Sequence, residues 1–233
     1  METGFIQAIK SIGEDLLGHV EQLPKQARFA RLLDGVVSKE EYALWLGNTL
    51  RYVPNTEEVH ARAARELAAD PGRRHLARRH EEGAREEKGH EVLLVNDLTA
   101  LAYRLTVSDV DQVIDTSPYI KAFADLEMPL VRQRNGIGAY GIAAIMELLS
   151  SALSPRMVSN LRNSSIANVT NALSFLTVHS EADGGAEGHA AQNRVLLASI
   201  SDPSDQAFVL RVASLTAAFY KFFIDDFSSL EPR

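Results

Sequence analysis

The sequence predicts an all-α protein, a bundle of about seven to nine helices folded as one domain over residues 1–233. Nearly everywhere along the chain, apolar residues recur at the spacing of about 3.6 residues that places them on one face of a helix. Helix-start signals, in which Ser or Asp precedes Pro, separate several of these segments. We find no convincing strand, hairpin, internal repeat or linker.

Three helices are expected in the first half of the chain, over residues 5–20, 38–67 and 72–103. Ser38 and Glu41 form the capping-box pair that opens the second of these helices. Pro54 lies inside that helix, and a kink is expected there because proline lacks the amide hydrogen. Asp70 and Pro71 form the start signal of the third helix, and no further proline follows within it. Residues 72–103 are therefore predicted to form one long helix.

The second half holds the remaining helices, which are expected over residues 118–134, 139–152, 154 onward, 171–183, 187–200 and 203–227. Ser117, Ser154 and Asp202 each precede a proline, a residue favoured in the first turn of a helix. A glycine-rich break follows the first of these helices. Two adjacent glycines, Gly184 and Gly185, weaken the helical pattern before residue 187.

The composition excludes several classes of protein. The chain has 24 Lys and Arg against 31 Asp and Glu, and this net charge of -7 opposes binding to nucleic acid. There are 0 cysteines, so disulfides and thiolate zinc sites are excluded, and any metal must be held by oxygen and nitrogen ligands, which suit iron or manganese. No apolar run is judged to approach the ~20 residues of a membrane span. No signal peptide is recognised, so a cytoplasmic location is expected.

A charged stretch precedes the most informative motif. Its basic residues are interleaved with glutamates, a pattern typical of a solvated helix face. The residues expected to face solvent are Arg73, Arg74, Arg78, Arg79, Glu81, Glu82 and Glu86, with His75 and His80 among them on the surface.

Glu87 and His90 form the most informative motif of the chain. Three positions apart on the expected helix 72–103, they project from the same face. A carboxylate and an imidazole at this spacing can bind one metal ion, and Glu-x-x-His is how helical bundles build carboxylate-bridged di-iron sites. Glu and His are common on helix surfaces, so the motif gains its weight from further candidate ligands along the chain.

Those further candidates are Glu147, His179 and Asp183. Glu147 has apolar neighbours on both sides, and burying a bare carboxylate is costly unless it is paired or bound to metal. A salt bridge or an exposed position remains the alternative for it. His179 follows an apolar segment, and Asp183 lies one turn later on the same face. The pair is either an imidazole oriented by its own carboxylate, or two ligands, or a ligand and the group that orients it.

The order of these residues resembles a known family. Glu86-Glu87-x-Gly89-His90, then a glutamate in an apolar helix, then His-x-x-x-Asp, resembles the heme-oxygenase-like di-iron oxidases and oxygenases, the iron-containing redox enzyme family. Residues 28–42 and 90–98 are similar to the early helices of the wider heme oxygenase, TenA and PqqC superfamily. The resemblance covers roughly residues 10–225, and it implies a heme-oxygenase-like helical bundle.

The resemblance also implies a set of iron ligands. The family's third-helix motif is His-x-x-x-Asp-x-x-His, and this chain has Ala186 at its last position, with His189 three residues further on. We expect the helix to bulge or unwind at Gly184 and Gly185, so that His189 supplies the missing imidazole. The expected metal ligands are Glu87, His90, Glu147, His179, Asp183 and His189. Some relatives recruit an extra ligand from the preceding helix, where this chain has Glu57, Glu58 and His60.

The activity implied by the resemblance is an O2-dependent oxidation at two iron ions. The implied substrates are small organic molecules of the amino acid, amine or fatty acid type, and the outcomes include N-oxygenation, oxidative decarboxylation and carbon–carbon cleavage. O2 is the implied co-substrate. The expected partners are the small-molecule substrate, an electron donor that the sequence does not identify and a second copy in a homodimer, with neither nucleic acid nor membrane.

Three alternatives remain open at this stage. One is a heme-binding protein like heme oxygenase, with His19 as the proximal ligand. Another is a metal-free relative of the TenA or PqqC type, with a helical cavity for a small cyclic substrate or cofactor. The last is a helical interaction protein, in which the acid and histidine pairs are buried salt bridges. A Soret band indicates heme, and iron without heme indicates the non-heme iron enzyme.

Overall fold

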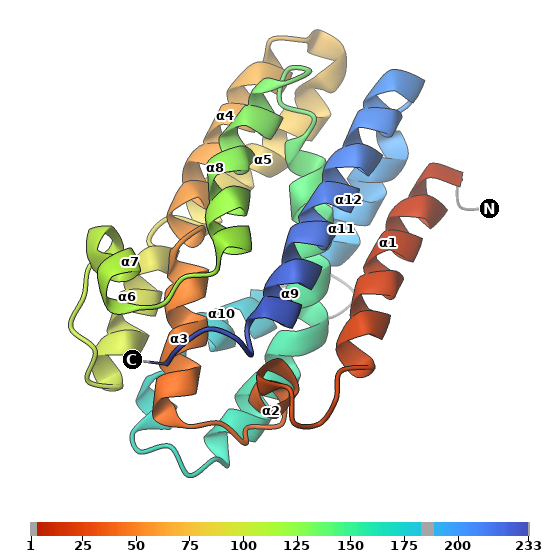
Figure 1. Cartoon of the computed structure of the whole chain (residues 1–233). Coiled ribbons are helices and arrows are strands. Elements are labelled where there is room, and N and C mark those ends of the chain that lie inside the picture. The colour runs from red at the N-terminus through yellow and green to blue at the C-terminus, as the bar shows by residue number, and fades with distance from the viewer. Residues whose placement is uncertain (1–3, 183–188, 233) are drawn as a thin grey trace.

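The structure of the protein is a computed structural model that describes residues 4–182 and 189–232. Every secondary-structure element within these residues is a helix, which confirms the all-α prediction (Figure 1). The α-helices of the described residues are α1 Gly4–Glu21, α2 Arg28–Leu33, α3 Lys39–Leu50, α4 Thr56–Ala68, α5 Arg74–Glu86, α6 His90–Ala100, α7 Val110–Val113, α8 Pro118–Arg132, α9 Ala139–Arg162, α10 Ser174–Ala182, α11 His189–Ser199 and α12 Pro203–Asp226. The short 3-10 helices among them are η1 Val53–Asn55, η2 Pro71–Arg73, η3 Val107–Asp109 and η4 Val169–Asn171.

The helices α9 and α12 form the centre of the bundle. α12 packs against α1, α8 and α9, while α9 also packs against α10 and α11. Figure 1 shows α1, α12 and α8 running alongside one another, with α4 and α5 packed together beyond α8. Tyr42, Tyr140 and Phe123 are among the largest side chains that are wholly buried in the core.

The central helix α12 is apolar over a longer stretch than was expected of any segment of this chain. By length and composition alone it could cross a membrane, contrary to the expectation that no apolar run reaches that length. In the described structure, 39% of the most apolar 18-residue stretch of α12 is buried. A core helix of a bundle passes the same test, so the apolar character of α12 is weak evidence for a membrane span.

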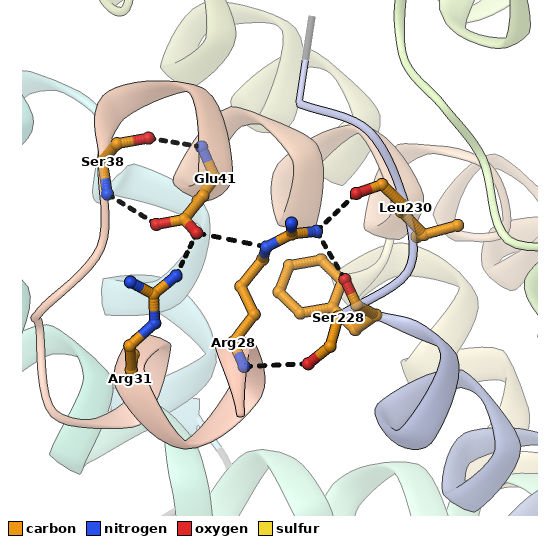
Figure 2. A network of polar contacts seen from close by, with 7 residues as sticks. Arg28, Arg31, Ser38, Glu41, Ser228 and Leu230 are labelled. Atoms are coloured by element: carbon orange, nitrogen blue, oxygen red, sulfur yellow. Dashed lines mark hydrogen bonds and ion pairs between the residues drawn. The ribbon is translucent and has the colours of Figure 1, made fainter. Parts of the chain in front are cut away.

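A polar network joins the early helices to the end of α12 (Figure 2). The predicted capping box is present: the Ser38 amide donates to the Glu41 carboxylate at 2.9 Å, and the Glu41 amide donates to the Ser38 hydroxyl at 3.1 Å. Glu41 also accepts a hydrogen bond of 3.2 Å from Arg28. Arg28 in turn donates to the backbone oxygens of Phe227 and Leu230 at 2.7 and 2.6 Å.

The expected helix over residues 72–103 is in fact two helices, and the break between them lies at the Glu87 and His90 motif. α5 ends at Glu86 and α6 begins at His90. Between them, Gly89 has a φ of +87°, a left-handed conformation that glycine adopts at little cost. Glu87 and His90 therefore meet across a turn, and not along one regular helix face.

Two proline predictions are also wrong. Pro54 does not kink one helix over residues 38–67, because it lies in η1 between α3 and α4. Pro155 does not start a helix, because α9 continues through it. An interior proline costs about 3 kcal/mol. Met157 and Leu161, which follow it, are buried, and the burial of such side chains offsets this cost.

Candidate metal centre

Three of the six predicted ligands come together in one cluster. One donor atom from each of Glu87, His90 and His179 lies within 4.8 Å of the others. Glu87 lies in the turn after α5, His90 is the first residue of α6, and His179 lies in the last turn of α10. All three side chains are partly buried.

Glu87 is held as an anion by its neighbours. The His90 Nδ1 lies 2.9 Å from Glu87 Oε2, and the Thr56 hydroxyl donates to the same oxygen at 3.1 Å. Burial acts to raise the pKa of Glu87, but the His90 hydrogen bond and the charges of His90, His179 and His60 outweigh burial and lower this pKa to about 2. The carboxylate is therefore ionised at neutral pH.

The two imidazoles of the cluster lie close together. The ring centroids of His90 and His179 are 4.7 Å apart, and the Phe175 ring lies 4.1 Å from the His179 ring. His179 Nδ1 is 2.9 Å from the Phe175 backbone oxygen. A hydrogen on Nδ1 satisfies that carbonyl, so in this tautomer Nε2 carries the lone pair that a metal ion needs.

Asp97 positions the helix that carries His179. It lies on α6, and its wholly buried carboxylate accepts hydrogen bonds of 3.0 Å from the backbone nitrogens of Ser174 and Phe175. The Ser174 hydroxyl donates to the same carboxylate. These amides are among the unsatisfied donors at the N-terminus of α10, and an anion is favoured there. The two histidine-bearing helices are thereby joined by one side chain.

Glu147 and His189, two other predicted ligands, lie beside a buried arginine. Arg79 is only 5% exposed, contrary to the expectation of a solvated face. Its guanidinium donates to Glu86 at 2.8 Å and lies 3.6 Å from Glu147. His189 Nε2 lies 3.4 Å from the same Glu86 oxygen. Arg79 thus pairs with the carboxylates of both Glu86 and Glu147.

A buried histidine pair adjoins the site. His80 is 1% exposed, which corrects its expected surface position, and its Nδ1 lies 3.2 Å from the Nδ1 of His60. Burial lowers the pKa of His60 to about 4 and lowers the pKa of His80 well below its usual range. Both rings are therefore neutral at neutral pH. Gly83 makes room for this pair, because a Cβ there would lie 2.1 Å from His60 Nδ1.

One cavity of about 150 Å³ connects these groups. Apolar side chains of α9, α10 and α12 form much of its wall. Its polar lining includes Glu87, His179, Arg79, Glu147, His189 and Glu127. A cavity of this composition, mostly apolar with a few convergent polar groups, is typical of a small-molecule site.

The remaining predicted site residues have different surroundings. Asp183, and the bulge predicted just after it, lie outside the described residues. Asn193 donates to Glu147 at 2.5 Å, and this amide contact was not anticipated. His19, the alternative heme ligand, bonds to Asp225 at 2.7 Å and is not among the described residues that line the cavity.

Sequence reasoning missed Glu127 and Asp97 as elements of the site. Glu127 stands between two apolar residues, in Leu-Glu-Met, and Asp97 follows Asn96 in the largely apolar α6 segment Leu-Val-Asn-Asp-Leu. The same signal, a carboxylate in an apolar helix, singled out Glu147. Arg79 carried no such signal, because its neighbours in sequence are charged.

Solved structures share this fold at low sequence identity. A TenA homologue from Pseudomonas syringae pv. tomato str. DC3000 has a TM-score of 0.77 and 14% identity, over 97% of this chain and 93% of its own. A domain of unknown function with a heme oxygenase-like fold from Shewanella denitrificans OS217 has a TM-score of 0.73 and 18% identity, over 94% and 89%. A TenA homologue from P. horikoshii OT3 has a TM-score of 0.70 and 16% identity, over 97% and 98%.

These likenesses confirm the predicted heme oxygenase-like fold. No family model matches the sequence, and no curated protein matches it. At such low identities the fold alone is established.

Proposed function

We propose that this chain, which has the heme oxygenase-like fold, is an iron-dependent oxidoreductase that uses O2 to oxidise a small organic substrate. The observation that carries the proposal is the cluster of Glu87, His90 and His179, of which Glu87 and His179 line the cavity. Iron bound there would supply the activation of O2.

The geometry of the cluster fits one ion. Donor atoms that are each about 2.0–2.2 Å from the same ion lie roughly 3–4 Å apart. Donor atoms already within 4.8 Å of one another need only a small inward movement to reach that arrangement. Two imidazoles and one carboxylate are the donor set of many non-heme Fe(II) oxygenases, and three protein ligands leave coordination positions open.

The chain's own residues prepare the site. Glu87 is ionised across the physiological range, so it offers a negative charge to a cation without losing a proton first. The Thr56 hydroxyl donates a hydrogen bond to Glu87 and orients its carboxylate, while the Phe175 carbonyl accepts one from His179 and orients its ring. The apolar wall of the cavity excludes water from a reactive centre and accommodates the apolar part of a substrate.

The proposal includes a second iron, held by Glu147, Asp183 and His189. In its support, Glu147 and His189 line the same cavity as the first cluster. Arg79 pairs with Glu147 and with Glu86, the partner of His189, so the second ion requires this guanidinium to move away. Substrates of the amino acid, amine or fatty acid type are proposed from the family resemblance.

A metal-free enzyme is the second candidate function. It is favoured by the likeness of the fold to two TenA homologues. In that case the cavity would bind a small cyclic molecule, and the Glu87 cluster would be a buried hydrogen-bonded group.

Metal analysis separates the two candidates. The purified chain is reconstituted with Fe(II) without oxygen, freed of unbound iron, analysed for iron and then exposed to O2 while its spectrum is recorded. We expect at least one iron per chain, no Soret band and a spectral change with O2. His90→Ala and His179→Ala should lose the iron, whereas His75→Ala, which removes an exposed histidine of α5, should keep it. An iron content that is unchanged in both site variants, or no iron in the unaltered chain, would refute the proposal.

A further inference from the structure

Glu127 is a buried carboxyl group that faces the cavity without a cationic partner. It lies on α8, it is 1% exposed, and its Oε2 accepts a hydrogen bond of 2.9 Å from the Asn55 side chain. Among the described residues it forms no ion pair. Arg51, a cation near it, pairs instead with Asp111 at 3.5 Å and with Asp125 at 3.1 Å.

The Tyr220 hydroxyl is a second incomplete polar group in the same region. Tyr220 lies on α12 and lines the cavity, and its buried hydroxyl has the Tyr52 hydroxyl as a side-chain partner, in a contact that falls outside normal hydrogen-bond geometry. Its ring packs edge-on against Tyr52, with centroids 5.9 Å apart. Tyr52 lies just before η1 and also lines the cavity. A buried hydroxyl whose hydrogen-bonding capacity the described residues do not fill is a place where a ligand gains affinity.

The charge of the region selects the kind of ligand. Burial raises the pKa of Glu127 to about 8, although Asn55 and Arg51 act in the opposite direction. Glu86, Glu87 and Glu147 line the same cavity, and its lining arginine, Arg79, is already paired with two of them, so the cavity disfavours an anionic group. A cation that donates hydrogen bonds would stabilise the ionised form of Glu127 and also satisfy the Tyr220 oxygen.

We propose that Glu127 and Tyr220 form the binding subsite for the ammonium group of a primary alkylamine. The ammonium donates to the Glu127 carboxylate and to the Tyr220 hydroxyl oxygen. Its alkyl part lies along the apolar wall of the cavity. A volume of about 150 Å³ holds on the order of ten water-sized groups at ~10–15 Å³ each, which is about the size of an eight-carbon amine.

Two consecutive residues, Asn55 and Thr56, connect the subsite to the candidate metal centre. Asn55 donates to Glu127, and its neighbour Thr56 donates to Glu87. The Cα atoms of Asn55 and Thr56, as consecutive residues, are only about 3.8 Å apart, so an amine held at Glu127 lies near the cluster of Glu87, His90 and His179. As a statement about the substrate of the enzyme, this inference rests on the proposed function. As a statement about binding, it does not require iron.

Calorimetric titration of the full chain tests the inference, with and without Fe(II). The probes are octylamine, 1-octanol and octanoate, which share one chain length and differ in the end group. We expect octylamine to bind at least tenfold more tightly than either of the others. At pH 7 its binding should release close to one proton, measured by comparing buffers of different ionisation enthalpy, because Glu127 is mostly protonated beforehand and ionises on binding.

The variants assign the effect to the subsite. Glu127→Gln should weaken octylamine binding at least tenfold and abolish proton release, and Tyr220→Phe should weaken binding several-fold. Glu66→Gln is the matched control, because Glu66 is a partly buried carboxylate of α4 that is not among the described residues lining the cavity. It should leave both quantities unchanged.

Absence of octylamine binding, equal binding of the three probes, or unchanged proton release in Glu127→Gln would overturn the inference. Octylamine binding by a chain that takes up no Fe(II) would leave the amine subsite standing and count against the proposed iron enzyme. The two claims can therefore fail separately.

Discussion

The Asp97 carboxylate on α6 accepts a hydrogen bond of 3.0 Å from the backbone nitrogen of Phe175 on α10. This contact fixes the start of the helix whose end carries His179 to the helix that begins with His90. The separation of the two imidazoles therefore depends on a carboxylate that would not itself contact the metal.

Removal of this carboxylate should weaken both the fold and the metal site. Asp97→Ala leaves buried amides of α10 without acceptors, and hydrogen bonds to a charged group contribute about 1.5–3 kcal/mol each. We expect the free energy of unfolding to fall by about 3 kcal/mol and Fe(II) affinity to fall at least tenfold. Urea unfolding and anaerobic iron titration measure these two quantities. Asp109→Ala, at a partly exposed capping position of η3, should change iron affinity little.

Glu127 should make stability depend on pH. Its folded pKa of about 8 lies above that of an unfolded glutamate, so the folded chain holds the proton more tightly. The stabilising contribution is complete below about pH 4.5 and is lost as pH rises through 8, by about 1.4 kcal/mol per pH unit. Glu127→Gln should remove this slope in urea unfolding measured from pH 5 to 8. A variant with the same slope as the unaltered chain would show that another group causes it.

Arg79 should oppose binding of a second metal ion. Arg79→Ala removes the cation between Glu86 and Glu147, and the loss of one partner of a buried ion pair destabilises a protein by about 3–5 kcal/mol. A bound divalent ion would offset this loss. We therefore expect Fe(II) to raise the Tm of Arg79→Ala more than that of the unaltered chain, with more iron bound per chain. Arg65→Ala, which breaks an exposed ion pair with Glu58, is the control. Equal iron content in Arg79→Ala and the unaltered chain would contradict the prediction.

Two glycine substitutions should have opposite effects on the stability of the folded chain. Gly83→Ala places a Cβ 2.1 Å from His60 Nδ1, within a buried histidine pair, and overpacking of this kind costs about 1–3 kcal/mol. Gly18→Ala, inside α1, meets nothing within 4 Å and should stabilise the chain by up to about 1 kcal/mol. Thermal unfolding of both variants checks the difference, and similar Tm values would contradict it.

The sequence predicts much of this fold because its helix signals are local. The Ser38 capping box, for example, depends on residues within one turn. Pro155 shows the limit of such signals, because burial of the following side chains keeps α9 continuous through it. Residues 72–103 show another limit, because no proline marks the break that Gly89 permits.

The candidate site was predictable only in part. Glu87 and His90 could be chosen from their spacing and His179 from the apolar segment before it, and the fold brings the three together. The burial of Arg79 and His80 depends on contacts between α5 and other helices, which no local pattern records.

The central claim is that Glu87, His90 and His179 hold iron. A crystal structure of the Fe(II)-loaded chain, with anomalous scattering recorded on both sides of the iron absorption edge, tests it most directly. We expect an iron peak about 2.0–2.2 Å from one donor atom of each of the three residues. An iron-loaded crystal without a peak among these residues, or with iron only at surface carboxylates, would contradict it.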